Sequence, residues 1–169
     1  MQTLGYRPDN HLKIKVTARD IPYYRDPAVI LIDQLKEVYI DGELEPVDTT
    51  NFFPKMMRRD YSVGMNLQGA GDSDETLPLL YGCGAEFNRN NYCNSDVEDL
   101  IGRQSIEADQ DKRRQLVWQI ERRLAEDIAR PIIFYGRGGT CRQPYVKGLT
   151  LMVNSIFNGW RMEDAWLDK

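Results

Sequence analysis

Three acidic side chains stand close together in the middle of the chain, just after a predicted strand. They are Asp72, Asp74 and Glu75. Carboxylates grouped in this way could bind a metal cation, or could pair with the ammonium group of a ligand. The same grouping also suits a solvated turn that binds nothing, and the residues alone leave the two interpretations open.

The three cysteines suggest a disulfide more than a metal site. Cys83, Cys93 and Cys141 lack the paired C-x-x-C spacing of structural zinc sites, so we expect no bound metal. Cys83 and Cys93 lie in one irregular stretch, where they are either two buried thiols or a disulfide. A disulfide closing so short a loop would stabilise the fold by about 2–3 kcal/mol.

A nucleophilic cysteine is the alternative that would make the chain an enzyme. Arg137 and Arg142 stand near Cys141 in sequence and could lower the pKa of its thiol. With His11, the only histidine, Cys141 could form the dyad of a small cysteine-dependent hydrolase. The simpler interpretation is that Cys141 packs in a glycine-rich turn, and that the protein is not an enzyme. The glycines at 136–139 lack the lysine and spacing of a phosphate-binding loop, so no cofactor is expected.

Composition excludes several classes of function. The net charge is -4, which argues against a general nucleic-acid binder. No apolar stretch approaches the ~20 residues that cross a bilayer. A length of 169 residues suits about one domain. The opening segment resembles the end of a helix, with Gly5 after it and Pro8 beyond, and we therefore expect the chain to be a fragment.

Hydrophobic periodicity predicts an α/β fold in which strands alternate with helices. The first half is expected to contain a strand at 12–16, a helix whose N-cap is Asp26 and whose first residue is Pro27, an edge strand at 44–47, a helix capped by Thr49 or Thr50 and ending at Met57, and a strand at 61–67. A long loop at 68–94 follows. The second half is expected to contain a helix from Ser95, a helix at 110–128 with Ile128 on its buried face, strands at 132–135 and 149–153, and a short helix at 161–167.

The order of these segments resembles the second lobe of the peptide-binding family of solute-binding proteins that serve ABC importers. The resemblance covers essentially the whole chain. The segments that carry it are Leu12-Lys13-Ile14-Lys15-Val16, Tyr61-Ser62-Val63-Gly64-Met65, Tyr92-Cys93-Asn94, Leu116-Val117-Trp118-Gln119-Ile120-Glu121, Gly139-Thr140-Cys141 and Asn154-Ser155-Ile156-Phe157-Asn158-Gly159-Trp160-Arg161.

The resemblance implies a mixed sheet flanked by helices, within a two-lobed protein that closes on a solute. Residues 1–149 would form the lobe, and residues 150–169 a tail that returns to the other lobe. The implied partners are a peptide or related small solute and a membrane permease, with no nucleic acid. The implied protein is a periplasmic monomer.

The resemblance also suggests which residues line the ligand cleft. They are Asn66, Gln68, Gly69, Asp72, Asp74 and Arg142. Relatives place an aspartate where Gly71 stands here, with Asp72 one residue further on. An aromatic residue is common at the position of Gln68.

Overall fold

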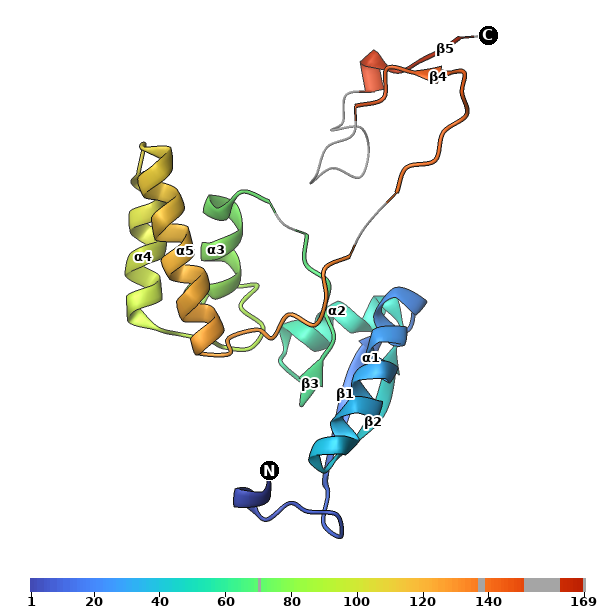
Figure 1. Cartoon of the computed structure of the whole chain (residues 1–169), viewed down its shortest axis with the longest axis vertical. Coiled ribbons are helices and arrows are strands. Elements are labelled where there is room, and N and C mark those ends of the chain that lie inside the picture. Colours follow the sequence, from blue (N-terminus) through green and yellow to red (C-terminus); the bar gives the residue numbers. More distant parts are fainter. Residues whose placement is uncertain (70, 137–138, 151–161, 169) are drawn as a thin grey trace. The chain divides into compact units, whose positions relative to one another are not determined.

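The computed structural model (Figure 1) describes residues 1–69, 71–136, 139–150 and 162–168. The chain divides into two compact units. Unit 1 comprises residues 1–68 and 78–98. Unit 2 comprises residues 69–77 and 99–169.

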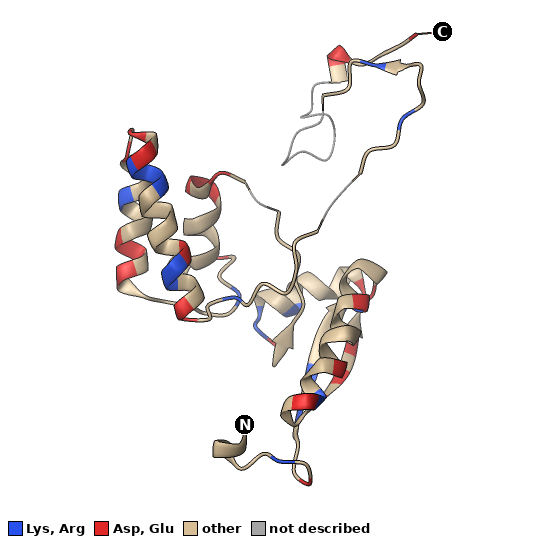
Figure 2. Ribbon diagram, in the orientation of Figure 1, with Lys and Arg blue, Asp and Glu red and all other residues tan. Residues whose placement is uncertain are grey.

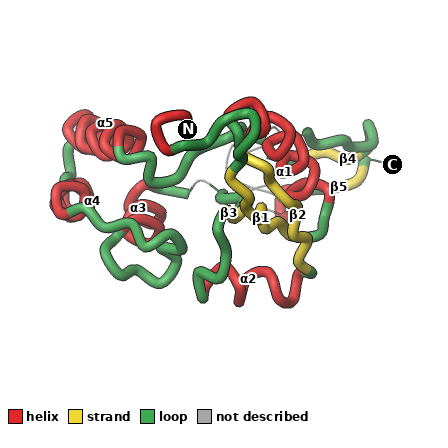
Figure 3. Tube along the Cα trace, turned by 90° about the horizontal axis from the view of Figure 1, so that it is seen from below, coloured by secondary structure: helices red, strands yellow, loops and turns green. Residues whose placement is uncertain are grey.

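Unit 1 is built on a three-stranded parallel sheet. The strands are β1 (Leu12–Arg19), β2 (Ile40–Val47) and β3 (Val63–Gly64), in the order β2-β1-β3. Helix α1 (Pro22–Leu35) connects β1 to β2, and α2 (Thr49–Met57) connects β2 to β3. Figure 3 shows the two helices on opposite faces of the sheet. This arrangement places the helix beginnings at the edge where the strands end.

The core of unit 1 lies where the two helices meet the central strand. Val16 and Ala18 of β1 are fully buried. Tyr24 and Ala28 of α1 and Phe52 and Met56 of α2 pack in the same cluster, with Met65 after β3. Close packing also requires a glycine on β2, because a Cβ atom at Gly42 would lie 2.9 Å from Ile32 Cγ1.

Strand β2 forms one edge of the sheet, as predicted from Pro46, but it begins four residues earlier than expected. Its polar residues complement those of β1, since Lys13 lies opposite Asp41 and Lys15 opposite Glu43. Opposite charges on neighbouring strands favour this register.

The beginning of α1 differs from the prediction. The helix begins at Pro22, with Ile21 as N-cap, and Pro27 lies inside it. Burial of Tyr24 on the same face as Ala28 explains the extra turn, because packing against the core stabilises helix on both sides of the proline. The cap of α2 was also predicted wrongly. Asp48, not a threonine, accepts hydrogen bonds from the backbone N–H groups of Thr50 and Asn51.

Two short 3₁₀ helices are described in the first 40 residues of unit 1. One spans Gln2–Leu4 and ends at Gly5, whose φ of 86° is left-handed, as expected for the residue that ends a helix. The other spans Lys36–Val38 and follows α1 directly. The expected strand at 61–67 is reduced to the two residues of β3.

The expected loop at 68–94 contains a helix, α3 (Ser73–Tyr81), so this prediction was wrong. Pro78 lies inside α3, while Leu77 and Leu80 are buried. Helix α4 (Ser95–Ile106) begins where predicted. Its first N–H groups are capped by Asn94, whose Oδ1 accepts from the Asp96 and Val97 amides at 3.0 and 3.5 Å.

Unit 2 contains the longest helix, α5 (Gln110–Glu126), which is capped by Asp109. Leu116 and Ile120 are buried, as the helical spacing predicts. Ile128 is not part of the buried face: it lies beyond the helix with a φ of 50° and is 70% exposed. Both acidic and basic residues occur along each of α4 and α5 (Figure 2).

The predicted strand at 132–135 is absent, and all four of its residues are exposed. An apolar run becomes a strand only when neighbouring strands pair with it, and the described residues supply none here. Leu149 and Thr150 are likewise outside any strand, and residues 151–153 lie outside the described residues.

The end of the chain forms a small antiparallel pair instead of the expected helix. Strand β4 (Val146–Lys147) pairs with β5 (Trp166–Leu167), and a 3₁₀ turn spans Met162–Asp164. Arg161 and the segment 154–160, which contributed to the resemblance, lie outside the described residues. The fold class is confirmed: the protein is α/β, with small sheets and flanking helices.

Candidate ligand-binding site

The segment after β3 leaves the sheet at the edge where the parallel strands end. The Met65 N–H still donates to the Thr17 carbonyl oxygen at 2.9 Å, and Met65 is buried. Asn66, Gln68 and Gly69 follow and are exposed. Ligands of open parallel sheets bind outside the carboxyl ends of the strands, so this segment stands where a ligand contact is expected.

The six residues predicted to line a cleft fall in both units. Asn66 and Gln68 are in unit 1, whereas Gly69, Asp72, Asp74 and Arg142 are in unit 2. Arg142 is exposed. Asp72 and Asp74 are joined by a contact, since the Asp74 N–H donates to the Asp72 carboxylate at 2.9 Å.

Asp72 caps α3 and forms an ion pair with Arg113 of α5. The Asp74 N–H, followed by the Arg113 guanidinium, lowers the pKa of the Asp72 carboxyl from its ordinary value. Asp72 is therefore ionised at neutral pH and already has two partners. Its role in this structure is to hold the beginning of α3 to α5.

Asp74 belongs to a polar network around Gln104, which is completely buried. The Gln104 amide donates to Asp74 at 3.2 Å and accepts from Arg113 Nε at 3.2 Å. The Ser105 hydroxyl also donates to Asp74. Because a buried amide costs free energy unless it is hydrogen-bonded, this network accounts for Asp74 without a ligand.

No group of three potential metal ligands is found among the described residues. Within the same residues, no helix is both long and apolar enough to cross a membrane.

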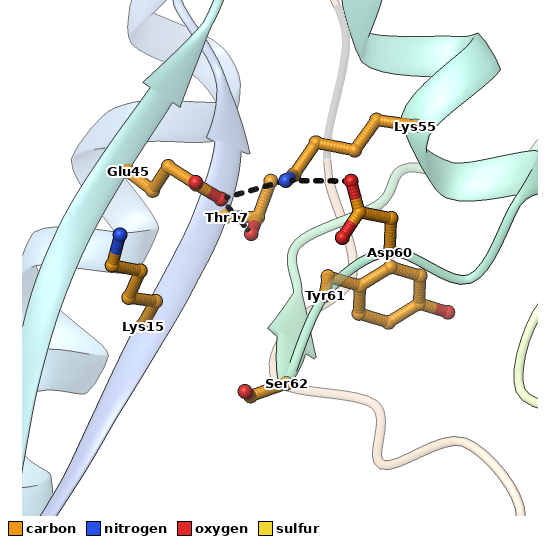
Figure 4. A pocket seen from close by; sticks show the side chains of 7 residues that line it. All are labelled: Lys15, Thr17, Glu45, Lys55, Asp60, Tyr61 and Ser62. Carbon is orange, nitrogen blue, oxygen red and sulfur yellow. Dashed lines mark hydrogen bonds and ion pairs between the residues drawn. The ribbon is translucent and has the colours of Figure 1, made fainter.

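Sequence reasoning missed a polar pocket of about 260 Å³ in unit 1 (Figure 4). Its lining residues are Lys15, Thr17, Glu45, Lys55, Asp60, Tyr61 and Ser62. The Lys55 ammonium lies 3.5 Å from the Glu45 carboxylate and 3.4 Å from that of Asp60. The available signal was the alternation of polar residues along β1 and β2, which placed Lys15, Thr17 and Glu45 on one face of the sheet.

The Glu45 carboxylate contacts both a hydroxyl group and an ammonium group of this pocket. The Thr17 hydroxyl donates to it at 2.6 Å. This hydrogen bond is the main cause that lowers the pKa of the Glu45 carboxyl, with a smaller contribution from the charge of Lys55. The charges of the pocket are thus largely satisfied by one another.

A disulfide joins Cys83 to Cys93 in unit 1, with the Cα atoms 4.7 Å apart. The enclosed loop is organised by Asn88, which is buried. Its amide donates to the carbonyl oxygens of Gly82 and Tyr92 at 2.8 and 2.6 Å. The Cys83 N–H donates to Glu98, so that carboxylate anchors the loop to α4.

The residues of the hydrolase alternative lie in different units. His11 is in unit 1, where its Nδ1 lies 2.9 Å from Asp41 Oδ1. Cys141 is in unit 2 and is an exposed free thiol. His11 thus has a carboxylate partner of its own, and the described residues of unit 2 show no contact that places a base beside Cys141.

Comparison with known proteins gives no match to a protein-family profile and none to a curated protein sequence. Solved structures do match. Haemophilus influenzae OppA in complex with the peptide RPPGFSPFR has a TM-score of 0.81 and 17% identity, covering 99% of this chain and 33% of its own.

Two further structures extend the likeness. DppA of Helicobacter pylori, an ABC transporter-associated periplasmic binding protein in complex with the peptide STSA, has a TM-score of 0.74 and 17% identity, covering 99% of this chain and 33% of its own. NikA of Staphylococcus aureus in complex with Ni(L-His)2 has a TM-score of 0.66 and 22% identity. The match covers 76% of this chain and 28% of the NikA chain.

The chain thus spans about a third of the length of the structures it matches. At these identities the likeness concerns the fold. The resemblance noted in the sequence is confirmed at that level: this chain has the fold of a part of the peptide-binding proteins of ABC transporters.

Proposed function

We propose that this chain is the substrate-binding part of an ABC transporter, capturing a peptide or a related small solute for import. The observation that carries the proposal is the likeness of fold to OppA over 99% of the chain. It is supported by the segment Asn66–Gly69, which leaves the sheet at the edge where parallel sheets bind ligands.

The proposal includes the organisation of the longer protein. Residues 1–149 form one lobe of a two-lobed binding protein, and residues 150–169 return to the other lobe. The ligand lies between the lobes, and closure excludes water from it. The partners are the solute and the membrane permease. The protein acts as a monomer and binds no nucleic acid.

An extracytoplasmic location agrees with the disulfide between Cys83 and Cys93, because such bonds persist in oxidising compartments. The protein acts by binding and not by catalysis. The contacts of three candidate residues support this. His11 is paired with Asp41, Asp72 with Arg113 and Asp74 with Gln104.

The proposal can be tested by nuclear magnetic resonance with the ¹⁵N-labelled chain. Trialanine is added to about 10 mM, and maltose serves as the non-peptide control. One lobe supplies half a cleft, so we expect a dissociation constant of about 1 mM or weaker. The backbone amides of Asn66, Gln68 and Gly69 should shift with trialanine and not with maltose.

Two results would count against the proposal. Identical shifts with maltose and trialanine would contradict peptide capture. Submicromolar binding by this chain would contradict a site shared with a second lobe.

A further inference from the structure

The polar pocket of unit 1 lies on one face of the parallel sheet, beside α2. Lys15 and Thr17 of β1 line it, and because residues two apart on a strand point to the same side, they share this face. Glu45 of β2, Lys55 of α2 and residues 60–62, which lead into β3, complete the lining (Figure 4). All of these residues belong to unit 1, so the pocket is formed within one compact unit.

The inner part of the pocket consists of groups that already have partners. Thr17 is completely buried, and its hydroxyl donates to the Glu45 carboxylate at 2.6 Å. The Lys55 ammonium lies 3.5 Å from the Glu45 carboxylate and 3.4 Å from that of Asp60, and the Lys55 side chain is only 19% exposed. Charges of both signs therefore lie next to one another in a place where water screens them less than at the open surface.

The outer part of the pocket has hydrogen-bonding groups that are still available. Lys15 and Ser62 are exposed, and neither side chain forms a hydrogen bond or an ion pair with the residues that the structure describes. Asp60 contacts Lys55 through Oδ2, which leaves Asp60 Oδ1 as an acceptor. A ligand at this opening would therefore meet an ammonium group, a hydroxyl group and a carboxylate oxygen.

The charge and the size of the pocket select a class of ligand. Its two lysines and two carboxylates balance, so a ligand with a net charge would be attracted by one pair and repelled by the other. An apolar ligand would remove water from polar groups without replacing the lost hydrogen bonds. The volume of about 260 Å³ is below the ~300–1,000 Å³ of pockets for drug-sized ligands. A small molecule with one positive and one negative group satisfies these three conditions.

We propose that this pocket is a second ligand site, which binds a small zwitterion of the α-amino acid type. The carboxylate of the ligand pairs with the Lys15 ammonium and accepts a hydrogen bond from the Ser62 hydroxyl. The ammonium group of the ligand donates to Asp60 Oδ1. The Tyr61 hydroxyl already donates to the Arg89 carbonyl oxygen at 2.9 Å, so Tyr61 contributes its ring as the wall of the pocket.

The second site is separate from the segment at which we propose that the transported solute binds. Thr17 precedes the last residue of β1 and Ser62 precedes β3, whereas Asn66–Gly69 follow β3. The two places therefore have different backbone amides and can be followed independently. The inference goes beyond the proposed function and does not depend on it.

The experiment follows the backbone amides of the ¹⁵N-labelled chain during titration with four small probes at constant ionic strength. L-Alanine carries both charged groups, alaninamide only the ammonium group and propionate only the carboxylate, while glycerol is polar and uncharged. We expect alanine to shift the amides of Thr17 and Ser62 and to leave those of Asn66–Gly69 unchanged. Alanine should bind at least about fivefold more tightly than each of the other three probes.

Variants then assign each charged contact. Lys15→Met should abolish the preference for alanine over alaninamide, and Asp60→Asn the preference over propionate. Lys13→Met is the matched control for the first variant, because Lys13 is an exposed lysine of β1 outside the pocket lining. Asp33→Asn is the control for the second, because Asp33 is exposed and also pairs with a lysine, at 3.0 Å. If Asp60→Asn fails to fold, Ser62→Ala at its exposed position should weaken alanine binding at least about twofold.

The outcomes separate this inference from the proposed function. Equal binding of alanine and alaninamide, or of alanine and glycerol, would overturn the zwitterion site. Alanine shifts confined to Asn66–Gly69 would also overturn it, because the amino acid would then bind at the other segment. A response to trialanine at Asn66–Gly69, with no response to alanine at Thr17 and Ser62, would overturn the second site and leave peptide capture standing. The reverse pattern would support the second site and contradict peptide capture.

Discussion

The Tyr61 hydroxyl donates a hydrogen bond to the carbonyl oxygen of Arg89 at 2.9 Å. This contact joins the segment before β3 to the disulfide loop. The Arg59 guanidinium donates to the neighbouring Asn88 carbonyl oxygen at 3.1 Å and supports the same connection. Two backbone carbonyl groups therefore hold the disulfide loop to the segment that leads into β3.

Replacement of Tyr61 by phenylalanine tests this connection. The variant removes the hydroxyl and leaves a half-buried carbonyl group without its donor, so we expect a loss of about 1 kcal/mol in the free energy of unfolding. The measurement is chemical denaturation. Tyr23→Phe, at an exposed tyrosine of α1, should leave the stability unchanged. Equal stabilities of the two variants would show that the contact contributes nothing.

The disulfide is expected to stabilise unit 1. Replacement of both Cys83 and Cys93 by serine removes the cross-link between two residues ten positions apart, so the unfolded chain gains conformational entropy. We expect the free energy of unfolding to fall by about 2–3 kcal/mol. Cys141→Ser is the control, because that thiol is exposed and unpaired. Alkylation of the unreduced protein should label Cys141 alone. Labelling of Cys83 or Cys93 without reduction would contradict the disulfide.

The buried amide of Gln104 is expected to stabilise unit 2. Gln104→Leu keeps the volume but removes the partner of Asp74 and Arg113, and we expect a loss of about 1–3 kcal/mol. The same substitution at Gln115, which is exposed on α5, is the matched control. Stability is measured by thermal unfolding. A neutral effect of Gln104→Leu would mean that an apolar contact replaces the network without loss.

The lowered pKa of Glu45 is expected to make the stability of unit 1 depend on pH in the acidic range. Its pKa is lowered in the folded protein, chiefly by the Thr17 hydroxyl, so its carboxylate contributes stability above the unfolded-state pKa of about 4.3. That contribution is lost as the pH falls through the lower folded-state pKa. Denaturation midpoints between about pH 2 and pH 6 should therefore depend less on pH in Glu45→Gln than in the unmodified protein.

The control for this effect is Glu43→Gln, which removes a carboxylate from an exposed position of the same strand. The comparison between the two variants isolates the contacts that Glu45 makes with Thr17 and Lys55 from the loss of a carboxylate as such. If both variants changed the pH profile equally, the hydrogen bond would not be the cause.

Hydrophobic periodicity correctly predicted the elements in which the apolar residues of the pattern are the ones that pack in the core. The alternation of Leu12 to Val16 gave β1, and the spacing of Leu116 and Ile120 gave α5. Long-range packing decided the others. Pro27 favoured a helix start, yet it lies inside α1 beside the buried Ala28. Within the predicted loop at 68–94, Pro78 lies inside α3 beside the buried Leu77. The run at 132–135 has an apolar pattern without a described strand to pair with.

The candidate site was less accessible to sequence reasoning. Asp72 and Asp74 stood out by their charge, but the partners that occupy them come from α4 and α5, far along the chain. The contacts of Arg19 and Arg89 with the ring of Phe53 went unnoticed for the same reason, because the three residues are separated by tens of residues in the sequence.

The central claim, that this chain captures a peptide-like solute, is tested most directly by thermal unfolding in the presence of a panel of peptides, amino acids and sugars. A ligand at tenfold its dissociation constant should add about 1.4 kcal/mol to the native state, or roughly 3–5 °C in midpoint. We predict that peptides raise the midpoint and that sugars do not. No shift with any peptide, or an equal shift with sugars, would contradict the claim.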